Sequence, residues 1–334
     1  MVVRRLQKVG AATFTVALPK EWVEARGLGA KSEVDVQILD DGNIRISTIS
    51  SEKRKEKEIT IKAKESDAGF LIRKVMAAYI AGYDVIRVDL SEMAPEFEGK
   101  EKLRKIIKSK MVGGEIIEES MSSIVVQILL RPYEYPLNKM LIRMTSMAHN
   151  MILDVCKAIE SKNKNILLDV IERDEDVDKL YFMGSRWLAS IIDDRFSSMD
   201  YDIKSDREVL EYRIVFRHVE RVADHVCKIA TILLDMSDRI ERDNATEIKT
   251  VLEKAANVFV RSVNCIKSNN LLDANKVIHD ARNVIRSVEV ILEKFGKLPN
   301  DFNLGPIALM LESVKRIAEY GIGISEIAFN INTN

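Results

Sequence analysis

The feature that most constrains the fold is a helical period that runs through residues 136–334. Apolar residues recur there at intervals of three and four positions, which is the spacing of one buried helix face. Breaks in this period divide the region into about six helices, and they fall near 161–164, 196–206, 238–244, 268–271 and 296–305. We therefore expect a C-terminal all-α region.

Two short segments of this region resemble each other. RVADH at 221–225 and RIAEY at 316–320 each lie late in the third helix of a set. A recurring segment of this kind indicates a repeated supersecondary unit. The region is therefore predicted to be a pair of three-helix bundles, at 136–240 and 241–334.

Two pairs of carboxylates stand out in the first predicted bundle. Each pair is spaced four residues apart and so lies on one side of its helix: Asp174 with Asp178, and Glu220 with Asp224. If the two helices pack antiparallel, four carboxylates can converge, and such oxygen ligands suit iron, manganese, magnesium or zinc. The alternative is a salt-bridged exposed face, because basic residues flank both pairs: Arg173, Lys179, Arg217 and Arg221.

The first 135 residues follow a different pattern. Residues 1–50 are predicted to be β-rich, with a strand, a short helix and two alternating strands at 13–18, 20–26, 33–39 and 43–47, the last two joined by a turn at Asp41-Gly42. Residues 51–135 are predicted to contain a mixed-charge linker and a small α+β module in the order β-α-β-α-β-β, with breaks at Pro95 and Arg131-Pro132. No ligand motif is present in this module, so we expect a linker or a sensory unit.

Charge is distributed unevenly along the chain. The formal net charge is −1, so any nucleic-acid binding must come from a local patch. Up to residue 31, Glu21 and Glu24 are outnumbered by six basic residues: Arg4, Arg5, Lys8, Lys20, Arg26 and Lys31. Such a patch can neutralise phosphates, and guanidinium groups can bind guanine edges. A few surface arginines on a small β domain are the alternative.

One family shows the same order of features in the N-terminal stretch. RRLQKVGAATFTVALPKEWVEARGLGAKSEVDVQILDDGNIRIS, which begins at Arg4, resembles the AbrB/MazE/SpoVT swapped-hairpin family. The resemblance implies an interlocked homodimer, because hairpins of this family complete one another's sheet. It also implies that DNA-facing residues lie near the first strand, at Arg4, Arg5 and Lys8, with Lys20 and Arg26 as further candidates.

The helical region is similar to another family. VIERDEDVDKLY at 170–181 and ERVADH at 220–225 look like the signature segments of PhoU phosphate-uptake regulators. That resemblance implies a metal site at Asp174, Asp178, Glu220 and Asp224. The second bundle departs from the pattern, because its corresponding residues are Ala281, Ile285, Lys315 and Glu319. We therefore expect one metal site in the chain.

Together these features predict a dimeric DNA-binding regulator of phosphate uptake. DNA, a second copy and the ATPase subunit of a phosphate transporter are its expected partners. An antitoxin-type binding module is the alternative. We do not expect an enzyme, because no histidine follows a glutamate by three residues and the HExxH and Walker A motifs are absent. Three isolated cysteines, with no long apolar run and no secretory signal, predict a cytoplasmic protein without membrane insertion.

Overall fold

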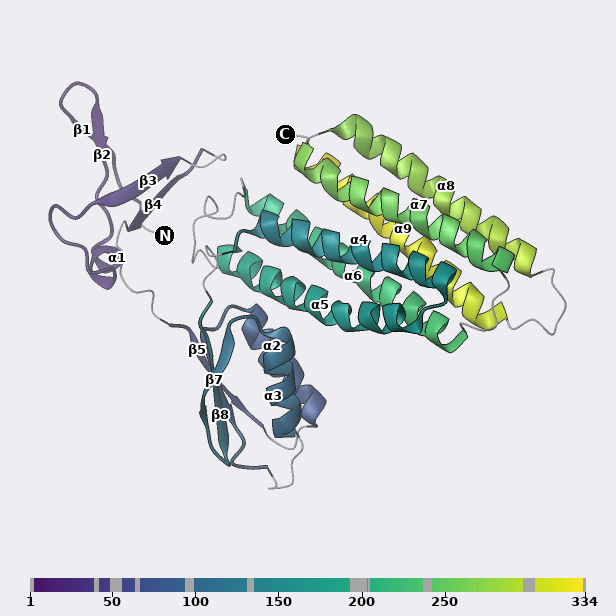
Figure 1. The fold of residues 1–334 in the computed structure, drawn as a ribbon. Helices are drawn as coiled ribbons and strands as arrows, with labels where there is room; N and C mark the ends of the chain where they lie inside the picture. Colours follow the sequence, from purple (N-terminus) through teal and green to yellow (C-terminus); the bar gives the residue numbers. More distant parts are fainter. Residues whose placement is uncertain are drawn as a thin grey trace. The chain divides into compact units, whose positions relative to one another are not determined.

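The computed structural model divides into two compact units, Met1–Lys55 and Glu56–Asn334, and each is considered by itself. It describes residues 3–38, 42–48, 56–63, 67–93, 99–130, 135–192, 203, 205–236, 242–268, 270–296 and 304–332 (Figure 1). Several predicted features lie outside these ranges: Asp41 of the turn, linker residues 51–55, Pro95 and Arg131-Pro132.

The N-terminal unit consists of two hairpins and a short helix. Strands β1 (Gln7–Val9) and β2 (Thr13–Thr15) pair antiparallel, as do β3 (Val34–Ile38) and β4 (Ile44–Thr48), and α1 (Lys20–Ala25) lies between them in the chain. The expected strand at 13–18 is shorter, and β1 was not predicted. Gly10 has a φ of 70°, which lets the chain turn back so that β1 pairs with β2.

The second unit begins with the predicted α+β module. Its elements are β5 (Glu58–Lys62), α2 (Ala68–Ile80), β6 (Val85–Asp89), α3 (Gly99–Lys110), β7 (Gly114–Glu119) and β8 (Ser123–Ile128). The strand order is β5-β6-β8-β7, with β5 parallel to β6 and the other pairs antiparallel. Helices α2 and α3 cover one face of this sheet (Figure 1) and bury a core with it.

Six long helices follow in the described ranges. They are α4 (Leu137–Ser161), α5 (Lys164–Ile192), α6 (Asp206–Met236), α7 (Arg242–Ser268), α8 (Leu271–Phe295) and α9 (Leu304–Asn332). Their ends agree with the predicted breaks, and the two sets of three helices share one continuous apolar core. The predicted fold class is therefore confirmed. No helix in the described ranges has both the length and the apolar character needed to cross a bilayer.

A glycine sets the close approach of α5 to α6. A Cβ atom at Gly184 would lie 2.5 Å from the ring of Phe216, so only glycine fits opposite this buried side chain. The same two helices carry all four predicted carboxylates. Their close packing brings these side chains within electrostatic reach of one another.

Candidate functional site

The four predicted carboxylates lie on two neighbouring helices and are sheltered from solvent to different degrees. Asp174 and Asp178 come from α5, and Glu220 and Asp224 come from α6. The side chain of Glu220 is 9% exposed, that of Asp178 is 16% exposed and that of Asp224 is 35% exposed. Glu220 and Asp178 are thus less exposed than the salt-bridged exposed face that the sequence left as an alternative would have them. We call these four residues the carboxylate cluster.

Burial and neighbouring carboxylates raise the pKa values of three of the four carboxyls. Burial, followed by the Asp178 and Asp224 carboxylates, raises the pKa of Asp174 to about 7. Burial, followed by Asp224, likewise raises the pKa of Glu220 to about 7. The pKa of Asp224 is also raised, chiefly by burial. Each of these carboxyls is therefore easier to protonate than an isolated one.

Three cations partly neutralise the cluster. Arg217 contacts Glu220 at 3.2 Å, and Arg221 contacts Asp224 at 2.9 Å on the same helix. The third is Lys110, the last residue of α3, whose Nζ donates to Asp178 Oδ2 at 2.6 Å. This contact joins the α+β module to the bundle. Asp174 has no ion-pair partner among the described side chains.

The donor set fits a hard cation in its chemistry, although the side chains are not gathered into a metal site. Within the described residues, no group of three or more His, Cys, Asp or Glu side chains is close enough together to hold a metal. All four cluster residues nevertheless offer carboxylate oxygens, and the buried Oε2 atom of Glu220 has no hydrogen-bond partner. The Arg221 guanidinium lies 3.8 Å from this atom.

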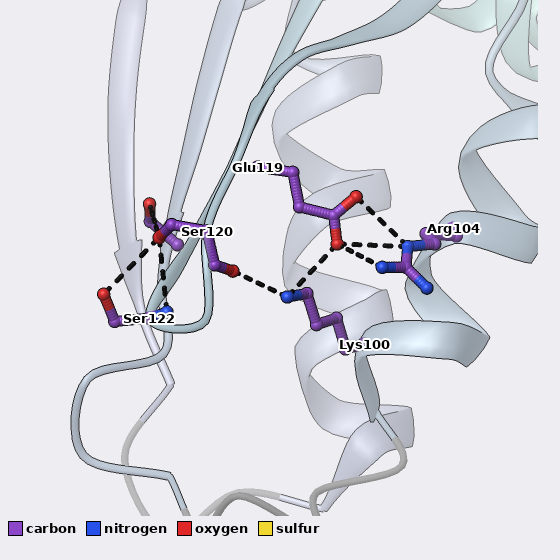
Figure 2. A network of polar contacts seen from close by, with 6 residues as sticks. Lys100, Arg104, Glu119, Ser120 and Ser122 are labelled. Carbon is purple, nitrogen blue, oxygen red and sulfur yellow. Dashed lines mark hydrogen bonds and ion pairs between the residues drawn. The ribbon is translucent and has the colours of Figure 1, made fainter.

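Helix α3 is held in place at its other end by a polar network, shown in Figure 2. Lys100 Nζ and the Arg104 guanidinium both contact the Glu119 carboxylate at the end of β7. Lys100 Nζ also donates to the Ser120 carbonyl at 2.6 Å. These contacts orient α3 so that Lys110, at the opposite end of the helix, reaches the carboxylate cluster.

A buried arginine fixes the module to the bundle beside this site. Arg186 of α5 donates at 2.7 Å to the carbonyls of Tyr79 and Tyr83 and lies 3.2 Å from Asp84. Its side chain is 5% exposed. Phe182, one turn earlier in α5, packs against both hydrophobic cores. The module and the first bundle therefore share a specific joint.

The predicted DNA-facing residues lie in the N-terminal unit and are all exposed. Arg4 and Arg5 precede β1, and Lys8 lies in it; none of the three has an ion-pair partner among the described residues. Lys20 contacts Glu24 at 3.5 Å, and the Arg26 guanidinium lies 5.2 Å from the centroid of the Trp22 ring. The first three cations are therefore freer to meet a phosphate than the last two.

Two families match separate parts of the chain. The PhoU domain family matches residues 141–233, and the family described as "Antidote-toxin recognition MazE, bacterial antitoxin" matches residues 7–67. The chain is a PhoU-like protein with an N-terminal MazE/AbrB-type domain. PhoU proteins are regulatory rather than enzymatic, which agrees with the expectation that this chain is not an enzyme.

A solved structure shows the same fold in the helical region. The phosphate transport system regulatory protein PhoU from Streptococcus pneumoniae is 14% identical, with a TM-score of 0.51, over 59% of this chain and 93% of that chain. PhoU from Pseudomonas aeruginosa is 16% identical, with a TM-score of 0.47, over 58% and 94%. No curated protein matches significantly.

The stretch that matches PhoU includes the whole carboxylate cluster, whereas the second PhoU-like bundle lies outside it. At the corresponding places in the second bundle, Ala281 is buried in the apolar core and Ile285 packs against it. Lys315 contacts Glu289 at 3.2 Å, and Glu319 contacts Arg316 at 2.9 Å. The second bundle thus has ordinary ion pairs where the first has clustered carboxylates.

Two residues at this site were not predicted from the sequence. Lys110 has no local signal in the sequence, because its partner Asp178 lies 68 residues away. Arg186 had a recognisable signal, because it interrupts an apolar run, MGSRWLASII. An arginine within such a run indicates a buried polar contact.

Proposed function

We propose that this PhoU-like protein is a dimeric DNA-binding regulator of phosphate homeostasis. The observation that carries the proposal is the presence of both domain types in one chain, a MazE/AbrB-type head and a PhoU-like bundle. The head supplies contacts to DNA, and the bundle reports phosphate status. Its partner for that report is the phosphate transport system, which the description of the Streptococcus neighbour names.

The N-terminal unit supports a dimer because its described residues form no core of their own. None of the described side chains between residues 3 and 48 is buried. Large apolar side chains are exposed instead, at Val3, Phe14, Val36, Ile38 and Ile44. A chain of this length needs additional buried apolar surface to stay folded, and a second copy provides it.

The test of DNA binding is the salt dependence of affinity for the DNA upstream of the chain's own gene. Six cations per dimer, from Arg4, Arg5 and Lys8, would contribute up to roughly 5 to the slope of log K against log salt. We expect the triple alanine variant to lose that part of the slope. Lys105→Ala/Lys108→Ala, on the exposed side of α3, is the matched control and should keep it. An unchanged slope in the triple variant would falsify the DNA-binding proposal.

We further propose that the carboxylate cluster is the single cation site of the chain. Asp174, Asp178, Glu220 and Asp224 would hold iron, zinc, manganese or magnesium, and the cation would offset the burial and the repulsion that raise the pKa values of Asp174 and Glu220. Metal analysis of wild type against Asp174→Ala/Asp224→Ala tests this. Equal metal content in the two proteins would reduce the cluster to a structural ion-pair network.

A second candidate function is supported by one observation. The family matched at residues 7–67 is described as a bacterial antitoxin that recognises a toxin. An antitoxin-type module would bind a toxin protein in addition to DNA. Co-expression with the product of a neighbouring small gene, followed by co-purification through the N-terminal unit, separates this candidate from the first.

A further inference from the structure

One edge of the module's sheet has no partner among the described residues. Strand β5 is at the end of the order β5-β6-β8-β7, and only β6 pairs with it. A groove of about 680 Å³ lies along this edge between β5 and α2. Its lining is mostly apolar and includes Phe70, which is 42% exposed, together with Ala77 and Ala81.

The other edge of the same sheet is protected against pairing. Strand β7 contains a register irregularity between Ile116 and Glu118, and three of its six residues are glutamates. Bulges and like charges are the usual means by which edge strands avoid association. Strand β5 has neither of these, since its sequence is Glu-Ile-Thr-Ile-Lys and its pairing with β6 is regular.

Hydrogen bonds to β6 determine which backbone groups of β5 face outward. The Lys57 carbonyl accepts from Val85 N at 3.2 Å, and Ala63 N donates to the Asp89 carbonyl at 2.9 Å. Because backbone groups alternate in direction along a strand, the odd-numbered residues bond to β6. The N–H and C=O groups of Glu58, Thr60 and Lys62 therefore point to the free edge.

These three residues are complementary to a second copy of themselves. If two β5 strands pair antiparallel about Thr60, each outward residue lies opposite an outward residue of the other copy. Glu58 then faces Lys62 at both ends, and the two Thr60 residues face each other. Opposite charges placed directly across an antiparallel pair stabilise it. Pairing in this register satisfies every outward-facing backbone group of β5.

The helix layer also suits this arrangement. Residues opposite each other in a sheet point to the same face, so the two copies of α2 would lie on the same side. Because α2 packs over β5 and β6, two strand spacings separate the helices, which is roughly 10 Å and a normal helix-packing distance. Small side chains at Ala77 and Ala81 allow this approach, and the groove beside Phe70 would be filled.

We propose that β5 is a second dimer interface, in which two modules join edge to edge into one continuous sheet. This interface would form in addition to the proposed N-terminal dimer. It depends on that dimer only because the dimer raises the local concentration of β5. In each copy, residues 49–57 connect the last described residue of the N-terminal unit to β5. Tethering two weak surfaces in this way raises their effective concentration.

Disulfide trapping in the full-length chain tests the register. In the proposed pair, the Cα atoms of the two Thr60 residues are about 5.5 Å apart, within the range of a disulfide. Lys62 is equally on the exposed side of β5, but two copies of it would be separated by roughly 13 Å. We expect Thr60→Cys to form a reducible cross-linked dimer on mild oxidation at least about tenfold faster than Lys62→Cys.

Charge substitutions in the Thr60→Cys background test the same strand register. Lys62→Glu should slow cross-linking because glutamates would face each other, and Glu58→Lys/Lys62→Glu should restore it. Equal cross-linking of Thr60→Cys and Lys62→Cys would overturn the interface, as would failure of the double swap to restore the rate. Size-exclusion chromatography of the reduced protein reports separately on the N-terminal dimer, which can stand if β5 pairing fails.

Discussion

Asp174 and Glu220 both have a pKa of about 7, because burial and neighbouring carboxylates disfavour their charged forms. The native state therefore binds these protons more tightly than the unfolded chain does. Stability from this source is present below the ordinary carboxyl pKa of about 4 and is lost as pH rises through about 7. The lowered pKa of His218 has the opposite effect, because it reduces stability as pH falls. The contribution of the carboxyls therefore has to be measured as a difference between wild type and a variant.

We expect Asp174→Asn to change this pH dependence. In the presence of a chelator, the wild-type free energy of unfolding should fall relative to that of the variant between about pH 5 and pH 7.5. Urea titrations of both proteins at the two pH values check it. Glu172→Gln, at an exposed position of α5, is the control and should behave like wild type. Parallel pH profiles for wild type and Asp174→Asn would contradict the coupling.

Lys110 supplies the positive charge that the cluster takes from the neighbouring module. Lys110→Met leaves Asp178, which is 16% exposed, without this ion pair and should destabilise the protein by roughly 1–2 kcal/mol. A divalent cation should then restore more stability to the variant than it adds to wild type, since it no longer competes with the ammonium group. Thermal unfolding with and without Mn²⁺ measures this. Lys108→Met, on the exposed side of the same helix, should respond like wild type.

At the scale of elements, periodicity predicted the helices but not the contacts between them. The break near 161–164 falls between α4 and α5 because apolar spacing is a local property of the chain.

The repeat between the two bundles is clearer in the structure than in the sequence. Asp154 and Arg261 each lie seven residues before the end of their helix (161 and 268), and each forms an ion pair with the following helix, at Arg173 and Asp280. The charges are exchanged between the two bundles, so residue identity alone conceals the equivalence.

The joint between α5 and the module depends on Arg186. Replacing it with methionine keeps an unbranched side chain but removes the guanidinium group. The carbonyl groups of Tyr79 and Tyr83 then lose this donor. We expect Arg186→Met to lower the free energy of unfolding by roughly 3–5 kcal/mol. Arg213→Met, a half-buried position on α6, provides the comparison. Urea unfolding followed by circular dichroism gives both values, and a loss below that of the comparison would show that the joint is held by apolar packing alone.

For the whole molecule, the sequence predicted the order of folded parts but not how they combine into units. The linker was placed at the N-terminal side of the module, and the boundary between the two compact units falls at Lys55. Nothing local in the sequence predicted that the module and bundles form one unit, because Lys110 and Arg186 meet partners far away in the chain. Long-range side-chain contacts of this kind do not leave a periodic signal.

The two units are expected to unfold separately, and the chain contains a reporter for each. Of its two tryptophans, Trp22 lies in the N-terminal unit and Trp187 is buried in the helical core. The N-terminal unit has no buried side chain among its described residues, so we expect its stability to depend on association. Glu56–Asn334 contains two cores of its own. A rise in protein concentration therefore stabilises only a unit whose folded state is associated.

Single-tryptophan variants separate these responses. In Trp187→Phe, a hundredfold rise in protein concentration should raise the melting temperature reported by Trp22 by roughly 10 °C. In Trp22→Phe, the transition reported by Trp187 should move much less, because the buried cores of its unit form within one chain. Fluorescence melts at two concentrations measure both. Because the proposed β5 pairing would also make the larger unit respond to concentration, both variants carry Lys62→Glu. If both transitions still shifted together, the N-terminal unit would be folding as part of the larger one, and the proposed division of labour between a DNA-binding head and a PhoU-like bundle would lose its physical basis.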